Sequence, residues 1–255
     1  MDEKVLYLQK QYKGYKDMRL PIRLEKCPLI DCIIEVRFDT NIVNSAVFGV
    51  IYNQIRSDYP GAVNNLPISQ LPEAIRMTDP NLRFKPLYRI EGDKTVIQIG
   101  PDVINLSSKM PYIGWDEFLR IAKKVLNKAF ESGAIGHISR LGHRYINFVD
   151  RDITSELAMS FKFENIDMQT VNSFNVRTTI AQGEYLNNLS LTNDGQFNGK
   201  RGSLIDIDTF REYPDDYFMN HMEEELQKVH QSEKMLFFSL LKESLLATLK
   251  PIYNE

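Results

Sequence analysis

A short apolar segment near the start of the chain carries an acid and a base at alternate positions. Residues 32–38 read CIIEVRF, in which every second side chain from Cys32 onward is apolar. Alternation with a period of two predicts a β-strand with one buried face, so Glu35 and Arg37 share the opposite, polar face. A carboxylate and a guanidinium placed in this way can bind a charged group of a ligand or partner, or each other as an ion pair.

A second polar set lies in the middle of the chain, where residues 138–149 read ISRLGHRYINFV and predict a long strand. His143, Tyr145 and Asn147 share one face of this strand, and Arg144 lies on the other. If the two strands pair at equivalent positions, a polar cluster forms across the sheet. It is either a concave surface that binds a ligand or partner, or ordinary cross-strand ion pairing. The candidate binding residues are Glu35, Arg37, His143, Arg144, Tyr145 and Asn147.

Other acidic and histidine residues are weaker candidates for chemistry. Asp206 and Asp208 alternate on one expected strand, a spacing at which two carboxylates can share a divalent cation. His221 and Glu225 stand at i and i+4 on an expected helix, which can chelate zinc. Neither pair has further ligands at a recognisable spacing, and no nucleophile motif is present. We therefore expect no metal, no cofactor and no catalytic residue.

The C-terminal part of the sequence predicts one long helix over residues 214–250. From 235 to 249 it reads MLFFSLLKESLLATL, which is apolar around most of a helix. A helix facing one sheet needs a narrower apolar stripe, so the excess has to be covered by a second subunit or by residues 1–30 folding over it. The residues expected at a subunit interface are Leu236, Phe237, Phe238, Leu240, Leu241 and Leu245.

The remaining elements fall into two halves with one order: strand, helix, three strands, helix. In the first half the ranges are 32–38, 44–59, 86–92, 94–100, 103–108 and 115–132, with a long loop at 62–84. In the second half they are 138–149, a short helix from 154, 174–182, 184–192, 203–210 and 214–250, with a loop at 193–202.

This order predicts an α+β fold with a curved, mainly antiparallel sheet and helices on one face. Duplication of a β-α-β-β-β-α unit is one explanation of the two halves. The expected organisation is an N-terminal arm at 1–30, a first half at 31–134 and a second half at 135–255, packed as one globular unit.

Composition excludes several classes of protein. The 255 residues include 31 Lys and Arg against 34 Asp and Glu, a net charge of −3 that disfavours a dedicated nucleic-acid binder. No apolar run approaches the roughly 18 residues that a membrane span needs. The first residues lack the apolar region of a signal peptide, and two cysteines do not make a disulfide framework. We expect a cytoplasmic protein with reduced thiols and no membrane association.

Three stretches together resemble a known family: CPLIDCIIEVRF, RLGHRYINF, and a C-terminal helix with His230, Phe237-Phe238 and LLKESLLATL. They are similar to the TIGR04255 family, sporadically distributed bacterial proteins of comparable length without established biochemistry. The resemblance covers essentially the whole chain and implies no catalytic residues. The family pattern has Leu where this chain has His143, which implies a packing role there. The patchy distribution of the family resembles that of defence-linked genes.

These observations favour a non-enzymatic cytoplasmic binding protein that acts through a homo-oligomeric or partner-protein interface. It would be a component of a larger bacterial system, with defence or toxin–antitoxin systems as candidates. The alternatives are a small-molecule-binding module, an enzyme that uses the polar strand cluster, and a nucleic-acid-binding saddle that uses Lys123, Lys124 and Lys128.

Overall fold

The computed structural model describes residues 19–160, 164 and 171–253. The strands in this part of the chain are β1 (Arg23–Leu24), β2 (Leu29–Thr40), β3 (Val63–Asn65), β4 (Tyr88–Glu91), β5 (Thr95–Ile99), β6 (Val103–Ser108), β7 (Ile135–Val149), β8 (Asn175–Gln182), β9 (Tyr185–Phe197), β10 (Lys200–Glu212) and β11 (Pro251–Ile252). The α-helices are α2 (Asn44–Ile55), α3 (Glu73–Thr78), α4 (Pro80–Arg83), α5 (Trp115–Glu131), α6 (Tyr217–Ser239) and α7 (Glu243–Thr248). Two 3-10 turns are η1 (Pro67–Gln70) and η2 (Thr154–Glu156). The predicted α+β class is confirmed.

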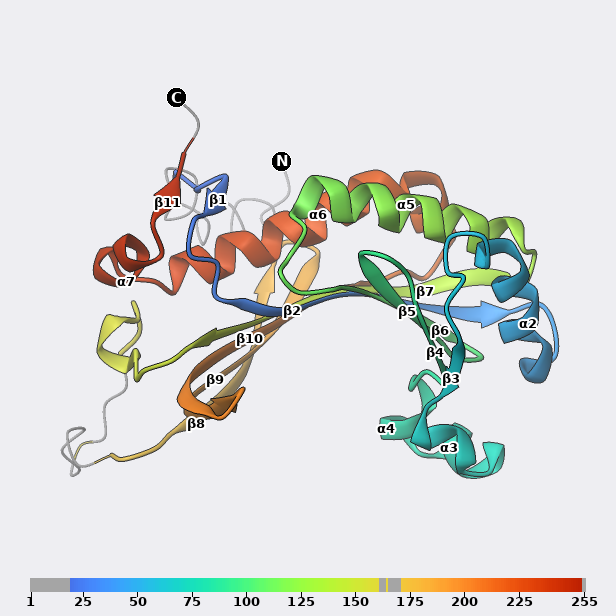
Figure 1. Cartoon of the computed structure of the whole chain (residues 1–255), viewed down its shortest axis with the longest axis horizontal. Helices are drawn as coiled ribbons and strands as arrows, with labels where there is room; N and C mark the ends of the chain where they lie inside the picture. Colours follow the sequence, from blue (N-terminus) through green and yellow to red (C-terminus); the bar gives the residue numbers. More distant parts are fainter. Residues whose placement is uncertain (1–18, 161–163, 165–170, 254–255) are drawn as a thin grey trace, which may run out of the picture. The chain divides into compact units, whose positions relative to one another are not determined.

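The large sheet has the strand order β3-β4-β5-β6-β2-β7-β10-β9-β8 and is antiparallel, as predicted (Figure 1). In one half β4, β5 and β6 form a meander that returns beside β2, with Asn105 opposite both Glu35 and Gln98. In the other half β8, β9 and β10 form a meander that returns beside β7. This equivalent order accounts for the repeated pattern in the sequence, and descent by duplication stays a prediction.

Packing divides the chain into two compact units. Unit 1 comprises residues 1–30, 145–209 and 230–255, and unit 2 comprises residues 31–144 and 210–229. Strands β7 and β10 and helix α6 each contribute residues to both units.

The core of unit 2 follows from the two periodicities in the sequence. Every second residue of β2, from Cys32 to Phe38, is at most 1% exposed, because this face is covered by helices. Helix α5 buries the apolar stripe that its 3.6-residue period predicts, including Phe118, Ala122 and Val125. Gly133 follows the helix with φ 72°, the left-handed conformation in which glycine commonly ends a helix.

The expected loop at 62–84 is wrong, because this segment contains β3, η1, α3 and α4. Its three prolines begin these short elements: Pro67 and Pro80 occupy first-turn positions and Pro72 is the N-cap of α3. None of the residues in η1, α3 or α4 is buried, so no apolar periodicity marks them in the sequence. We call residues 62–84 the helical insert.

The hairpin expected within the loop at 193–202 is present, but the loop is much shorter than predicted, because β9 and β10 continue through it in unit 1. Only Asn198 and Gly199 separate the strands, with φ values of 48° and 76°. Positive φ at both positions matches the tight turn that Asn-Gly favours, since its twist fits that of the flanking strands. The abundance of Asn and Gly therefore marks a turn and not a long loop.

The single long helix expected over 214–250 is instead two helices, α6 and α7. The chain leaves the helical path at 240–242, where Ala158 N donates to Leu240 O and Lys242 N donates to Glu156 O. A bridge between Leu157 and Leu241 lies between these bonds. Hydrogen bonds to residues 156–158 thus take the place of helical hydrogen bonds at this point. Within the described residues, no helix is long and apolar enough to cross a membrane.

The apolar residues expected at a subunit interface lie in the core of unit 1, where they are between 0% and 8% exposed. The set is Leu236, Phe237, Phe238, Leu240, Leu241 and Leu245. They pack with residues of β9 and β10 such as Leu189 and Ile207, and Leu20 and Leu24 pack against the same cluster. The interface assigned to these side chains is therefore corrected. The excess apolar surface is covered within the chain, partly by its N-terminal segment.

Candidate functional site

Two arginines from different strands share one carboxylate oxygen in unit 2. Glu35 Oε1 accepts hydrogen bonds from Arg37 Nε at 2.8 Å and from Arg140 Nη1 at 2.5 Å. Glu35 and Arg37 lie on β2, and Arg140 lies on β7. Charge-assisted bonds of this kind fix the orientation of both guanidinium planes.

Each of these guanidinium groups also stacks on an aromatic ring. The guanidinium carbon of Arg37 lies 4.3 Å from the centroid of Phe84, and that of Arg140 lies 4.3 Å from the centroid of Phe210. Cation–π contact holds a planar guanidinium flat against the ring, which leaves its edge available for hydrogen bonds. We call the five residues Glu35, Arg37, Phe84, Arg140 and Phe210 the arginine site.

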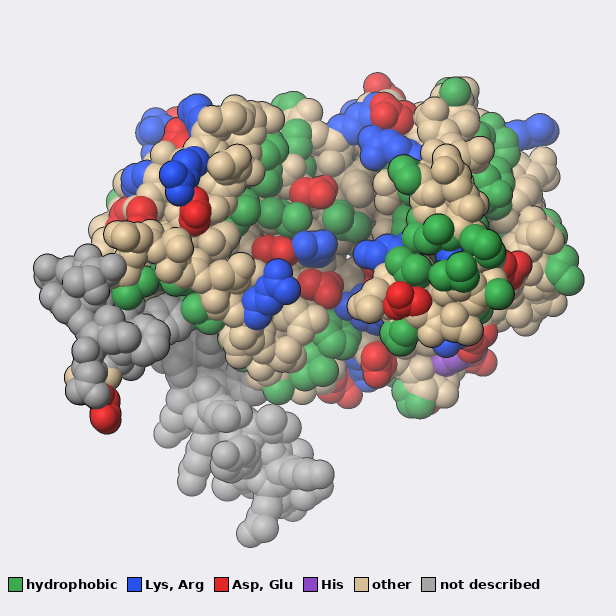
Figure 2. All heavy atoms as spheres, turned by 90° about the horizontal axis from the view of Figure 1, so that it is seen from below, with side chains coloured by type: hydrophobic (Ala, Val, Ile, Leu, Met, Phe, Trp, Pro, Cys, Tyr) green, Lys and Arg blue, Asp and Glu red, His purple; other side chains and the backbone are tan. Residues whose placement is uncertain are grey.

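The arginine site borders a hollow of about 460 Å³, a volume typical of ligand pockets. Arg37, Phe84 and Arg140 line it together with Ser139, Glu212, Tyr213 and Pro214. The side chains of Arg37, Glu35 and Arg140 are 28%, 22% and 8% exposed, so Arg37 is the most accessible of the three. Figure 2 shows acidic and basic side chains side by side on the face turned away from α5. Such a hollow can bind an anionic group at the accessible edge of Arg37.

A buried carboxylate, Asp102, lies close to the arginine site. It is 7% exposed, and its nearest cationic atom, Arg83 Nε, is 3.6 Å away. Burial raises the pKa of Asp102, and the charges of Arg83 and Arg37 partly offset that rise. The Arg83 guanidinium also lies 4.9 Å from the Phe84 ring, so the end of the helical insert is held by two arginines.

His143 lies on the other face of the sheet from Glu35 and Arg37. It is 0% exposed, its Nε2 is 4.0 Å from Cys32 Sγ, and the ring of Trp115 meets it edge-on at 5.2 Å. Cys32 belongs to the buried face of β2, whereas Glu35 belongs to the opposite face. The expected cluster that joins His143 to Glu35 and Arg37 is therefore wrong, because His143 fills a core position.

Because His143 is buried, the free energy of unfolding should fall as the pH is lowered. Burial lowers the pKa of His143 to about 3, so the folded protein keeps the ring neutral while the unfolded chain protonates it below pH 6.5. Stability is thus lost as the pH falls from 6.5 toward 3. Between pH 6.5 and 5 this residue alone should lower the free energy of unfolding by about 2 kcal/mol, measured by urea denaturation.

The variant His143→Leu isolates that contribution from those of the carboxylates. Leucine does not titrate, so the difference in unfolding free energy between wild type and variant should change by about 2 kcal/mol over the same range. Parallel profiles for the two proteins would show that His143 is protonated equally in the folded and unfolded states.

The other sequence candidates have separate surroundings. In unit 1, Glu233 Oε1 accepts a hydrogen bond from Tyr145 N at 2.6 Å, and Tyr145 Oη is 3.3 Å from His230 Nδ1. Asn147 Nδ2 donates to Ile205 O at 3.4 Å, also in unit 1. Arg144 is a half-buried residue of β7 in unit 2. Of the six candidates, only Glu35 and Arg37 belong to the arginine site.

Three members of the arginine site were missed from the sequence. Arg140 shares a face with Arg144, opposite the face of His143, so the strand pattern contained a signal for it. Phe84 ends the helical insert, which carries no apolar periodicity, and Phe210 reads as an ordinary apolar strand residue. Their contacts with the arginines depend on strand order, which single-strand patterns do not contain.

Helix α6 carries a buried carboxylate that the sequence suggested only as a zinc ligand. Glu225 is 0% exposed, and its Oε2 accepts hydrogen bonds from Arg211 Nη1 at 2.9 Å and from Tyr213 Oη at 2.6 Å. These donors give Glu225 a structural role in unit 2. His221 instead interrupts the helix, with φ −129°, and its Nδ1 contacts Tyr217 O at 2.9 Å. Among the described residues, no three His, Cys, Asp or Glu side chains gather as a metal site.

Comparison with known proteins does not narrow the class of protein that the fold and the arginine site define. No protein-family model matches the chain, and no curated protein is significantly similar to it. The class that the structure defines is an α+β protein with an antiparallel sheet and a paired-arginine hollow.

Proposed function

We propose that this chain is a non-enzymatic binding protein, which docks a partner protein on unit 2 and binds an acidic group of that partner with the arginine site. The observation that carries the proposal is the shared Glu35 oxygen, which fixes Arg37 and Arg140 at the wall of a hollow. Guanidinium groups stay charged and donate in a fixed fork geometry, which suits carboxylate recognition better than proton transfer.

The helical insert supports a protein as the partner. Three of its apolar side chains, Val63, Leu71 and Ile75, are 37%, 39% and 51% exposed. Hydrophobic side chains gather over α3 and α4 in Figure 2. Protein interfaces combine apolar anchors with arginines, whereas a small anion needs no such apolar surface. We call Val63, Leu71 and Ile75 the insert patch.

The partner is either a different protein or a second copy of this chain. The cytoplasmic location, the membership of a larger bacterial system and its link to defence belong to the same proposal. They rest on the sequence pattern and on the family resemblance.

Site-specific photo-crosslinking in the cells that encode the protein tests this function. We expect p-benzoylphenylalanine in place of Leu71, and separately in place of Ile75, to give a crosslinked adduct on denaturing gels, and the two adducts should have the same mass. The adduct mass shows whether the crosslinked partner is a second copy of this chain or a different protein. Adding Arg37→Ala should remove most of the adduct, because the partner then loses a charge-assisted contact.

Leu186 is the matched control, since it is also an exposed leucine, at 40%, but lies on β9 in unit 1. The crosslinker at this position should give no such adduct. The proposal fails if positions 71 and 75 give none in vivo, or if all three positions give the same one. An adduct that persists in Arg37→Ala would reject the arginine site as the recognition element.

A further inference from the structure

A second hollow, of about 470 Å³, lies wholly within unit 1. Its lining comes from the segment before β2, the end of β7, the β9–β10 hairpin and the end of α7. The residues that matter here are Lys26, Cys27, Phe148, Arg151, Phe197 and Lys200. None of them belongs to the arginine site or to the insert patch, so this hollow is independent of the proposed function.

The lining of this hollow has an excess of positive charge. It contains Lys26, Arg151 and Lys200 against one carboxylate, that of Asp150; Glu156, outside the lining, pairs with Arg151, so Lys26 and Lys200 carry the excess. Lys200 Nζ lies 2.9 Å from Asp150 Oδ2, in a pair whose side chains are 66% and 56% exposed. Such an exposed pair is weak and does not prevent Lys200 from binding another anion. An anionic ligand is therefore favoured over a neutral or cationic one.

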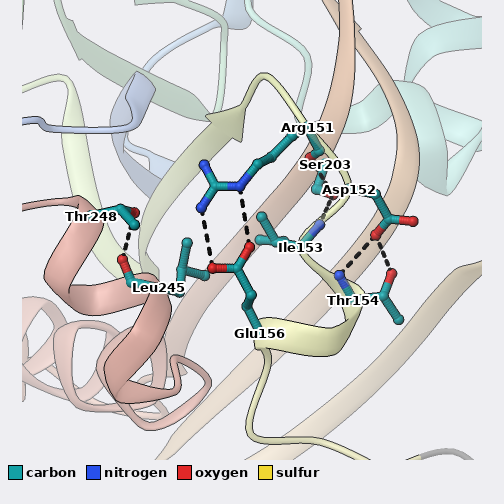
Figure 3. A network of polar contacts seen from close by, with 8 residues as sticks. All are labelled: Arg151, Asp152, Ile153, Thr154, Glu156, Ser203, Leu245 and Thr248. Carbon is teal, nitrogen blue, oxygen red and sulfur yellow. Dashed lines mark hydrogen bonds and ion pairs between the residues drawn. The ribbon is translucent and has the colours of Figure 1, made fainter.

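Arg151 is the rigid member of these cations. Its Nε and Nη2 donate to the two oxygens of Glu156 at 3.1 and 3.2 Å, and its carbonyl accepts a bond from Ser203 Oγ at 3.0 Å (Figure 3). Ser203 Oγ in turn accepts a bond from Ile153 N at 3.1 Å. This network holds the end of β7 in place without a ligand. A preformed wall lowers the entropic cost of binding.

The rest of the lining has an aromatic pair and a thiol. The rings of Phe148 and Phe197 lie 5.7 Å apart at an angle of 53°, which provides apolar surface from two strands. Cys27 is exposed to solvent, and partial desolvation of its thiol raises its pKa, so the group is an uncharged part of the lining at neutral pH. Cations beside aromatic surface suit a ligand that has both a negative group and a flat apolar body.

We propose that the unit 1 hollow binds a small organic anion, with its negative group at Lys26 and Lys200 and its flat body against Phe148 and Phe197. Cys27 reports on occupancy, because it lines the hollow, while the other cysteine of the chain, Cys32, is 0% exposed.

Alkylation of Cys27 by iodoacetamide, followed by mass spectrometry of the intact full-length protein, tests the proposal with phenyl phosphate as the probe. We expect phenyl phosphate at ten times its Kd to slow alkylation about tenfold. Inorganic phosphate lacks the ring and benzyl alcohol lacks the charge, so neither should slow the reaction at the same concentration.

The double variant Lys26→Gln, Lys200→Gln should raise the Kd for phenyl phosphate by about tenfold or more, from the ratio of alkylation rates with and without the probe. Lys94→Gln, Lys109→Gln is the control, because both lysines form ion pairs in unit 2, where Lys94 is exposed and Lys109 is half-buried. The proposal is overturned if phenyl phosphate gives no protection at 10 mM. Equal protection by benzyl alcohol, by phosphate or in the charge variant also overturns it.

Discussion

Replacing Glu225 by alanine should lower the free energy of unfolding by about 3–5 kcal/mol, measured by urea denaturation. Glu225 is fully buried and accepts hydrogen bonds from Arg211 and Tyr213. The variant removes the carboxylate that accepts a hydrogen bond from Arg211 Nη1, on a side chain that is only 16% exposed. The loss is large because a buried charge that loses its partner keeps its desolvation cost.

The neighbouring residue Glu224 provides the control. Its side chain is 54% exposed and pairs with Lys228 at 2.7 Å, so Glu224→Ala should change stability by about 0.5 kcal/mol or less. The double variant Arg211→Leu, Glu225→Leu should recover part of the loss, since it removes these two charges together, while Tyr213 Oη and Lys228 Nζ still lose their contact with Glu225. Equal effects of Glu224→Ala and Glu225→Ala would mean that Glu225 is solvated in the folded protein.

Leu245→Ala should lower the free energy of unfolding by about 2–5 kcal/mol and leave the native mass unchanged. Leu245 is 0% exposed in the apolar cluster of unit 1, so its truncation removes buried methyl groups and leaves a cavity. An interface residue would behave differently, because its loss would shift the mass at a given concentration. Light scattering and urea denaturation of the same samples separate the two.

Leu186→Ala is the matched substitution at an exposed leucine of the same unit, and it should change stability by about 0.5 kcal/mol or less. If Leu245→Ala unfolds with wild-type stability but dissociates a dimer, the residue belongs to a subunit contact, and the assignment of the cluster to the core of unit 1 is wrong.

Strands and helices with one buried face were predictable from the sequence. The segments at 32–38 and 103–108 form β2 and β6, and the helix expected at 115–132 is α5. In each case one face packs on a core, so burial imposes a period of two or 3.6 on the apolar residues. The helical insert could not be found in this way, because none of the residues in its helical elements is buried.

The candidate site was predictable only in part, because the pattern of 138–149 fixes which residues share a face but, with polar side chains on both faces, not which face is buried. Leu141 shares the face of His143 and is 0% exposed, so this face of β7 lies in the core. The opposite face carries Arg140, which meets Glu35 across two neighbouring strands. The aromatic partners Phe84 and Phe210 come from distant segments, and only the strand order brings them to the arginines.

The pairing of β1 with β11 affects how the chain folds as it is synthesised. Arg23 lies opposite Ile252, and the apolar cluster of unit 1 includes Leu245 and Leu249. The core of unit 1 therefore cannot close until residues 245–252 have left the ribosome. The meander of β4, β5 and β6 involves neighbours in sequence and can form much earlier. Until then, Leu20 and Leu24 lack the surface they later cover and stay exposed on the growing chain.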